Sequence, residues 1–246
     1  MIIPLIESLK LHYRAFKYKN KDDRGGIAYI LSSLSPGQTA IDIGAHKAGY
    51  LHYMQQQVGI TGLVYAFEPQ SNLYQYLCKM VKIKQWKQVV VERIALSDQQ
   101  GSGTLYIPTN QVSNSTSSPG ASLLQNKDPE QYTTSETVPT DTLDQYCSKR
   151  DIQPHFLKID VEGNELKVLK GAIYTLQTYK PKILIEIEAR HIGAAQVFET
   201  FTFLMSIGYT GHFIEGSQRS PLAEFSIEQH QNIRSKNAYC NNFTFE

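Results

Sequence analysis

Residues 40–49 come close to the glycine-rich turn, G-x-G-x-x-G, that binds the pyrophosphate of a dinucleotide between a strand and a helix. They read Ala-Ile-Asp-Ile-Gly-Ala-His-Lys-Ala-Gly, so the outer glycines are present as Gly44 and Gly49. The middle glycine of the pattern lets the backbone approach the phosphates, and His46 takes its place here. The segment therefore predicts a strand–turn–helix that binds a nucleoside ligand and disfavours NAD.

The same segment indicates a cationic ligand. Asp42 precedes the first glycine by two residues, where a positively charged cofactor suits better than an anionic one. S-adenosylmethionine carries a sulfonium and an amino group and has no phosphate, so we predict it as the cofactor. The candidate contacts are the residues in and around the turn, namely Asp42, Gly44, Ala45, His46, Gly49 and Tyr50.

Glu68 ends the next predicted strand, 24 residues after Gly44, and Pro69 follows it. An acid at this place in a dinucleotide-binding fold accepts hydrogen bonds from the ribose hydroxyls. A carboxylate in front of a helix is also stabilised by the helix dipole, which would be a structural role. Because the glycine turn lies upstream, we favour ribose binding and include Pro69 among the cofactor contacts.

Four carboxylates follow two apolar segments that are predicted to be buried strands. Asp160 and Glu162 close the first segment, and Glu186 and Glu188 close the second. Ionisable groups are costly to bury unless they are paired or used, so these acids indicate a site for the cofactor amine, a substrate hydroxyl or a divalent cation. The structural alternative is a network in which Lys158, on the same strand face as Asp160 and Glu162, neutralises one carboxylate.

Burial and mutual repulsion should raise the pKa of at least one of these carboxylates and make it a base for a hydroxyl near neutral pH. Asp160 and Glu162 are the candidate catalytic residues, and Asp160 is also a candidate cofactor ligand. Glu186, Glu188 and His191 are candidate substrate contacts. Two alternatives stay open, since hard carboxylate oxygens suit Mg²⁺ and since Glu162 could simply cap the following helix.

Alternating strands and helices predict a mainly parallel sheet that positions these residues. Strands are expected at residues 39–43, 63–67, 89–95, 156–161 and 183–187. Helices are expected after Gly49, after Ser71 and after Asn164, which is the expected N-cap of a helix reaching Leu176. Short strands near 209–214 and 243–245 predict a closing antiparallel hairpin at the sheet edge.

Residues 1–34 are predicted to form a helical extension before the main domain. Apolar residues recur at helical spacing from Ile2 to Phe16, and Gly25-Gly26 is expected to break the chain before a short helix at 27–34. The basic second half of the first helix indicates a packing helix with a solvated face. A lid, a homodimer arm and a contact with an acidic partner are the alternatives.

Residues 108–137 interrupt the alternation of strands and helices. They are rich in Ser, Thr, Asn and Gln and contain Pro119-Gly120, so they are predicted to be irregular. So long an irregular insertion is either a lid over the acceptor site or a surface insertion without a role in binding.

The segment 157–172 resembles the signature of the FkbM family of S-adenosylmethionine-dependent methyltransferases, K-I-D-x-E-G-x-E-x-x-V/L-L-x-G-A. It reads Leu-Lys-Ile-Asp-Val-Glu-Gly-Asn-Glu-Leu-Lys-Val-Leu-Lys-Gly-Ala and matches every fixed place. Thr142-Leu143-Asp144, Ala95-Leu96-Ser97-Asp98 and Gly120-Ala121-Ser122-Leu123 are similar to further segments of the family. His46 departs from the family pattern, because members commonly have Asn there.

The resemblance implies a Rossmann-like α/β fold with a seven-stranded class I methyltransferase sheet and helices on both faces. It also implies O-methylation of a hydroxyl on a sugar or natural-product acceptor. It adds Ala95 and Leu96 to the cofactor contacts and Ser122 to the substrate contacts. The signature requires no ion, so we expect no metal. A nicotinamide-dependent oxidoreductase, which His46 argues against, and a non-catalytic cofactor-binding protein of the same fold are the alternatives.

Length and composition limit the classes of protein to which the chain could belong. The chain has 246 residues, enough for one large α/β domain at 35–246, and its 24 basic and 23 acidic side chains nearly cancel, so no nucleic-acid partner is expected. Cys78, Cys147 and Cys240 form no C-x-x-C pair and read as thiols of a reducing compartment. No apolar run approaches the roughly 18 residues of a membrane span, and no signal peptide is recognisable. We expect a cytoplasmic enzyme that acts on a small-molecule or glycan acceptor.

Overall fold

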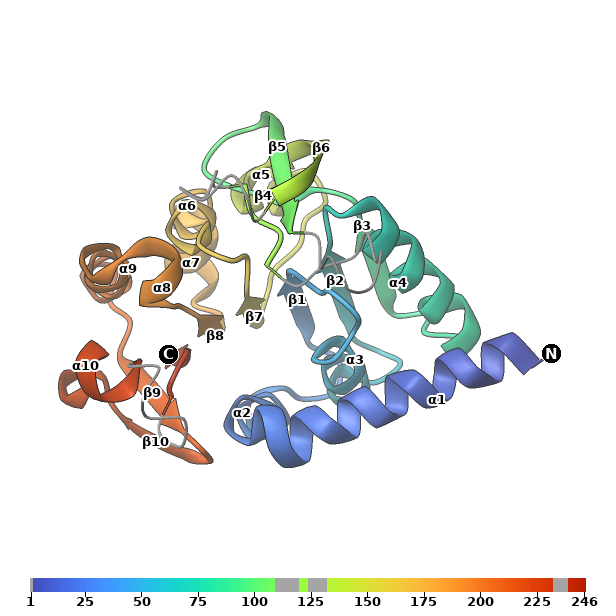
Figure 1. The fold of residues 1–246 in the computed structure, drawn as a ribbon, viewed down its shortest axis with the longest axis horizontal. Helices are drawn as coiled ribbons and strands as arrows, with labels where there is room; N and C mark the ends of the chain where they lie inside the picture. Colours follow the sequence, from blue (N-terminus) through green and yellow to red (C-terminus); the bar gives the residue numbers. More distant parts are fainter. Residues whose placement is uncertain (1, 109–119, 124–131, 232–238) are drawn as a thin grey trace.

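The computed structural model describes residues 2–108, 120–123, 132–231 and 239–246. Within them the chain forms an eight-stranded sheet with helices on both faces (Figure 1). The order across this sheet is β10-β9-β11-β8-β7-β1-β2-β3. The strands are β1 Thr39–Ile43, β2 Leu63–Phe67, β3 Val89–Glu92, β7 Phe156–Ile159, β8 Lys182–Glu186, β9 Gly211–Glu215, β10 Gln218–Pro221 and β11 Asn242–Phe245.

The pairs β1–β2, β2–β3, β1–β7 and β7–β8 are parallel, so these five strands end at the same edge of the sheet. The chain reverses its order at β1, which pairs with β2 on one side and with β7 on the other. Ile43, for example, lies opposite Phe67 and Ile159. In open α/β sheets this reversal opens a crevice at the carboxyl ends of the central strands.

Alternating side chains of the strands build two cores, one on each face of the sheet. Ile41 and Leu157 pack into the core under α5 Leu143–Ser148, α6 Glu165–Lys170, α7 Ile173–Tyr179 and α9 Ala194–Ser206. Ala40 and Phe156 pack into the core under α1 Ile2–Lys17, α2 Arg24–Ser33, α3 Leu51–Val58 and α4 Ser71–Lys84. The sequence-based expectation of helices on both faces is confirmed.

The number of strands differs from the seven expected. Gly216, with φ of +62°, lets the chain reverse after β9 and pair back as β10, which adds an eighth strand at the edge. The closing pair is also not a simple edge hairpin, because β11 lies between β8 and β9 and is antiparallel to both. α8 Ala189–Ile192, η3 Leu222–Glu224 and α10 Ile227–His230 connect this part of the fold.

After β3 the chain forms a second, three-stranded sheet, in the order β4-β6-β5. Its strands are β4 Ala95–Leu96, β5 Gly101–Pro108 and β6 Tyr132–Asp141. The expected strand at 89–95 is therefore wrong in its second half, because β3 ends at Glu92 and Ala95 pairs with β6 instead. The expected irregular segment 108–137 is wrong at its end, where residues 132–137 pair with β5. Residues 109–119 and 124–131 of this segment lie outside the described residues, and Ser122 between them pairs with Tyr106 of β5.

Two helix boundaries also differ from expectation. The helix after Asn164 is divided into α6 and α7 around Gly171, where a side chain would lie 2.0 Å from the carbonyl oxygen of Ser97. Near the N-terminus, α2 begins at Arg24 and contains both glycines of the expected break. Asp23 caps this helix by accepting a hydrogen bond from the backbone amide of Gly26 at 2.9 Å. A π-helical turn, η1 Tyr18–Asp22, joins α1 to α2.

Candidate active site

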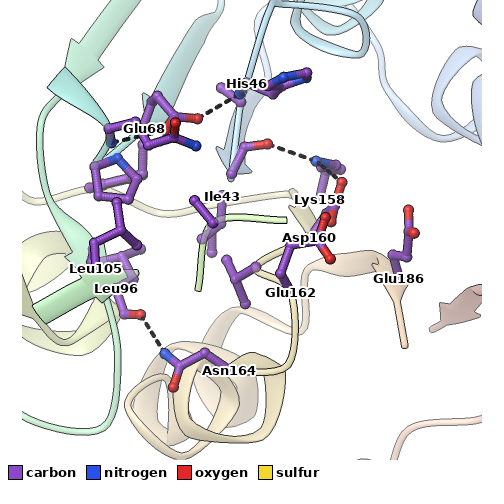
Figure 2. Close-up of a pocket in the computed structure, with 18 of the residues that line it drawn as sticks. Ile43, His46, Glu68, Leu96, Leu105, Lys158, Asp160, Glu162, Asn164 and Glu186 are labelled. Atoms are coloured by element: carbon purple, nitrogen blue, oxygen red, sulfur yellow. Dashed lines mark hydrogen bonds and ion pairs between the residues drawn. The ribbon is translucent and has the colours of Figure 1, made fainter. Parts of the chain in front are cut away.

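One cavity of about 260 Å³ lies at the carboxyl ends of β1, β2, β7 and β8 (Figure 2). In this view Glu68, Leu96 and Leu105 lie on one side of Ile43, and Lys158, Asp160 and Glu186 lie on the other. The sequence-predicted residues that line the cavity are Gly44, Ala45, His46, Gly49, Tyr50, Glu68, Pro69, Ala95, Leu96, Asp160, Glu162 and Glu186.

The turn after β1 lines this cavity. Gly44 has a φ of +81°, and a Cβ on it would lie 1.8 Å from the carbonyl oxygen of Asp160, so only glycine fits there. The amides of Gly44 and Ala45 donate to the carbonyl of Phe67 at 3.0 and 3.1 Å. His46 adopts a φ of 47°, a left-handed conformation that is uncommon for residues with a side chain. The strained turn thus ties the ends of β1, β2 and β7 together.

Glu68 holds the turn from the end of β2. Its carboxylate accepts the backbone N–H of His46 at 2.8 Å and that of Gln70 at 3.0 Å. Burial raises the pKa of Glu68 to about 7, although both amides favour the charged form. A carboxylate has about four acceptor positions, so Glu68 can accept further hydrogen bonds from a ligand.

Lys158 is the cation at the centre of the site. Its ammonium donates to the carbonyl of Gly44 at 3.0 Å and contacts Asp160 at 3.2 Å and Asp42 at 3.7 Å. Burial lowers the pKa of Lys158, but Asp160, Asp42 and Glu186 outweigh this effect and raise it above its ordinary value. Burial raises the pKa of Asp42 to about 6, so this pair is ionised at pH 7. Lys158 therefore makes the contacts that the structural alternative requires of it, with Asp160 and Asp42.

The remaining acids have other partners. Glu188 is paired with Arg190 at 2.5 Å and accepts a hydrogen bond from the Tyr239 hydroxyl. Asn241 donates to Glu186 at 2.6 Å. Burial first, and then the charge of Asp160, raises the pKa of Glu186 well above its ordinary value. Sequence reasoning had identified only Lys158 as a partner, because Tyr239 and Asn241 come from a distant part of the chain.

Glu162 combines backbone strain with a raised pKa. It has a φ of 54° just after β7, so the turn, rather than strand alternation, sets its direction. Its carboxylate lies 3.0 Å from Nδ1 of His191. Burial, followed by the charges of Asp160 and Glu188, raises the pKa of Glu162 to about 7. The neighbouring Glu165, not Glu162, accepts the amides of this turn, at 2.9 Å from Gly163.

Four predicted site residues do not line the main cavity. Asp42 is fully buried behind the turn. Glu188 and His191 line a small adjoining pocket with Asp160, Glu162, Gly163, Glu165 and Glu186. Ser122 donates a hydrogen bond from its hydroxyl to the backbone carbonyl of Glu162 at 2.7 Å. Within the described residues, no group of three or more His, Cys, Asp or Glu side chains could hold a metal ion.

Sequence reasoning missed several lining residues. Tyr18 contacts Gly49, where a Cβ would lie 3.2 Å from the tyrosine ring, and no local signal predicts this contact between η1 and the turn. Asn164 is the N-cap of α6, as expected, but its side chain does not cap the helix and its amide instead donates to the carbonyl of Leu96 at 3.3 Å. Other cavity residues that were not predicted are Ile43, Phe67, Gln70, Ile94, Leu105 and Val161. Gly120, Ala121 and Leu123 also line the cavity, and they belong to the segment 108–137, for which a lid over the acceptor site is one of the two expectations. Lys158, expected only as a counter-ion, lines it as well.

The polar groups that line the cavity fit S-adenosylmethionine. Two lining residues carry buried side-chain atoms without a hydrogen-bond partner in the described part of the chain, Nε2 of His46 and Oδ1 of Asn164. Burial lowers the pKa of His46 to about 4, so its ring is neutral at pH 7 and adds no charge against a cationic ligand. Carboxylates lie on both sides of Ile43 and outnumber the buried ammonium of Lys158, which suits a nucleoside with a cationic tail better than a phosphate.

This sheet topology, with a glycine turn, an acid at the end of β2 and acids at the end of β7, defines a class I methyltransferase fold. The chain belongs to the FkbM methyltransferase family, since the model of the methyltransferase FkbM domain matches residues 42–242. A search of curated protein sequences found no match.

The fold is similar to that of many solved structures, and two of them serve as examples. The methyltransferase FkbM from Methylobacillus flagellatus superposes with a TM-score of 0.55 and 15% identity, and the match covers 98% of this chain and 55% of that one. This chain therefore spans about half of the length of that relative. A protein from Clostridium thermocellum described as an rRNA-methylase candidate superposes with a TM-score of 0.51 and 13% identity, over 89% of this chain and 92% of that one. At these identities the likeness shows the fold alone.

Proposed function

We propose that the protein is an S-adenosylmethionine-dependent O-methyltransferase whose acceptor hydroxyl binds beside Asp160 and Glu162. The observation that carries this proposal is one cavity that contains the glycine turn, Glu68 and both of these acids. Membership of the FkbM family supports methyl transfer. The raised pKa of Glu162 supports an oxygen acceptor, because a carboxylate with a pKa near 7 can take up a hydroxyl proton at neutral pH.

S-adenosylmethionine, when bound, supplies an electrophilic methyl group to the acceptor oxygen. Glu68 would hold the ribose hydroxyls with the acceptor positions that the two backbone amides leave. Asn164 and Leu96 would border the adenine, and Asp160 would hold the amino group of the cofactor. Lys158 orients Asp160 through their 3.2 Å contact.

Glu162 is the proposed base. Its carboxylate lines the main cavity and also faces His191, which can share the proton that Glu162 takes up. Burial lowers the pKa of His191, so its ring is neutral at pH 7 and keeps an acceptor nitrogen. Ser122, which pairs with Tyr106 of β5, donates to the backbone carbonyl of Glu162 and thereby helps to hold the base in its strained conformation.

The acceptor is proposed to be a hydroxyl-rich molecule such as a sugar or a polyketide-type natural product. The carboxylates of Asp160, Glu162 and Glu186 lie together at one side of the cavity, and each can accept hydrogen bonds from acceptor hydroxyls. The FkbM resemblance supports this class of acceptor.

Calorimetric titration with S-adenosylmethionine, S-adenosylhomocysteine and NAD tests the cofactor. We expect binding of the first two and none of NAD, since His46 takes the place of the glycine that a pyrophosphate needs. Tighter binding of NAD than of S-adenosylhomocysteine would overturn the proposal.

Turnover with a panel of sugar and polyphenol acceptors tests the reaction. Asp160→Asn should lose both turnover and cofactor affinity, whereas Glu162→Gln should lose turnover alone. Glu199→Gln is the matched control, because Glu199 is an exposed acid paired with Lys170 on the outer helices. Full activity of both site variants would exclude this mechanism.

A further inference from the structure

Helix α1 has two apolar faces, and only one of them is covered. Leu11 and Ala15 are buried against the core of the domain. On another face of the same helix, apolar side chains recur every three or four residues and remain exposed. They are Leu5, Ile6, Leu9, Tyr13 and Phe16, with exposed fractions of 62, 44, 59, 69 and 65%.

The exposed residues form one continuous apolar face on a single helix. Figure 1 shows α1 along the edge of the molecule, with its N-terminal end extending past α4. A soluble helix normally buries its apolar face and exposes a polar one, so an uncovered apolar face on α1 indicates a partner. We refer to the side chains of Leu5, Ile6, Leu9, Tyr13 and Phe16 as the α1 outer face.

Basic side chains surround the α1 outer face. Residues 1–24 contain six Lys or Arg and three Asp or Glu, a surplus of three positive charges in a chain whose net charge is +1. From α4, Lys84 reaches Ser8 and His12 on α1, at 3.4 and 3.2 Å. Exposed Lys19 and Lys21 follow directly after the helix. The partner is therefore expected to be anionic.

We propose that the α1 outer face binds the surface of an anionic lipid bilayer. Leu5, Leu9 and Phe16 would enter the interface between headgroups and acyl chains, while the surrounding lysines contact the headgroups. This arrangement of leucines and aromatic residues bordered by lysines is typical of helices that lie in the plane of a membrane. None of the described helices is long and apolar enough to cross a membrane, so the contact is with the surface.

A second copy of the chain is the competing occupant. Two α1 helices packed on this face would bring like charges together, because Glu7 is the one acidic residue within α1 and it already pairs with Lys10. Like charges at a contact cost free energy that the apolar contacts would have to exceed. Charge complementarity thus favours the lipid surface over a homodimer.

Co-sedimentation of the full chain with vesicles tests this proposal. We expect binding to vesicles that contain phosphatidylglycerol, weaker binding to vesicles of phosphatidylcholine alone, and loss of the difference at 1 M salt, where the screening length is about 3 Å. Leu9→Ser/Phe16→Ser should reduce vesicle binding by at least about tenfold, and Lys19→Glu/Lys21→Glu should reduce it by a similar factor.

The control is Phe198→Ser, which removes an exposed aromatic side chain from α9, on the far side of the sheet from α1. It should bind vesicles as the parent does, and circular dichroism should show that all variants keep the fold. Equal binding by the parent and by Leu9→Ser/Phe16→Ser would overturn the proposal. A second result would also overturn it: the parent binds no vesicles and is a dimer in sedimentation velocity, and Leu9→Ser/Phe16→Ser is a monomer.

Discussion

Replacing Glu68 with glutamine removes a charge but keeps the size of the side chain. Each oxygen of Glu68 accepts one backbone amide, from His46 and from Gln70, and the residue is 4% exposed. Glutamine offers one oxygen and one NH₂ group, so one of these amides loses its acceptor and faces a donor. Leaving a buried amide unpaired costs about 1–3 kcal/mol, which we expect as a loss of unfolding free energy.

The same substitution tests ribose binding. A charge-assisted hydrogen bond contributes about 1.5–3 kcal/mol, so Glu68→Gln should weaken the binding of S-adenosylhomocysteine by roughly tenfold to a hundredfold. Calorimetry at a temperature well below the midpoint of unfolding separates this loss from the loss of stability.

Glu92→Gln is the matched control for Glu68→Gln. Glu92 ends the adjacent strand β3 and accepts the hydroxyl of Tyr146 at 2.8 Å, but it does not line the cavity. It should lose stability and keep ligand affinity. A folded Glu68→Gln protein that binds S-adenosylhomocysteine as tightly as Glu92→Gln would refute the assignment of Glu68.

Three further substitutions test the catalytic base, the turn and a buried acid. Glu162→Gln should lower turnover by about 10²–10⁴-fold and remove a rise in turnover as pH increases through 7, where the parent carboxylate loses its proton; an unchanged pH profile would exclude Glu162 as the base. Gly44→Ala places a Cβ 1.8 Å from the Asp160 carbonyl oxygen and should lower the unfolding free energy by more than about 1 kcal/mol in urea titrations; equal midpoints for parent and variant would show that the turn tolerates a side chain there. Burial raises the pKa of Glu165 from 4.5 to about 7, so the folded protein keeps a proton that the unfolded chain releases, and stability falls as pH rises through this window. Between pH 5 and pH 8, Glu165→Gln should reduce this fall in the unfolding free energy by up to about 3 kcal/mol, as measured by urea unfolding. If the unfolding free energy of the variant falls as much as that of the parent, other groups cause the pH dependence.

The sequence alone predicted the elements whose signals are local. β1 and β2 have the expected bounds, and the glycine turn and Glu68 lie where their spacing placed them. These predictions succeed because apolar strands, a turn that needs glycine and an acid at the end of a strand each depend on a few neighbouring residues. The signature around Asp160 was similarly sufficient to indicate the family.

Contacts between distant parts of the chain decided the rest. The position of β11 between β8 and β9 and the contact of Tyr18 with Gly49 depend on how the sheet is assembled. The pairing of Lys158, which lines the cavity, with Asp42, which is buried outside it, likewise follows from packing. The two residues are 116 positions apart in the sequence and meet because β1 and β7 are adjacent in the sheet. A pattern of residue types shows which groups are available for chemistry, but burial and distance decide which of them meet, and these exist only once the strands are side by side.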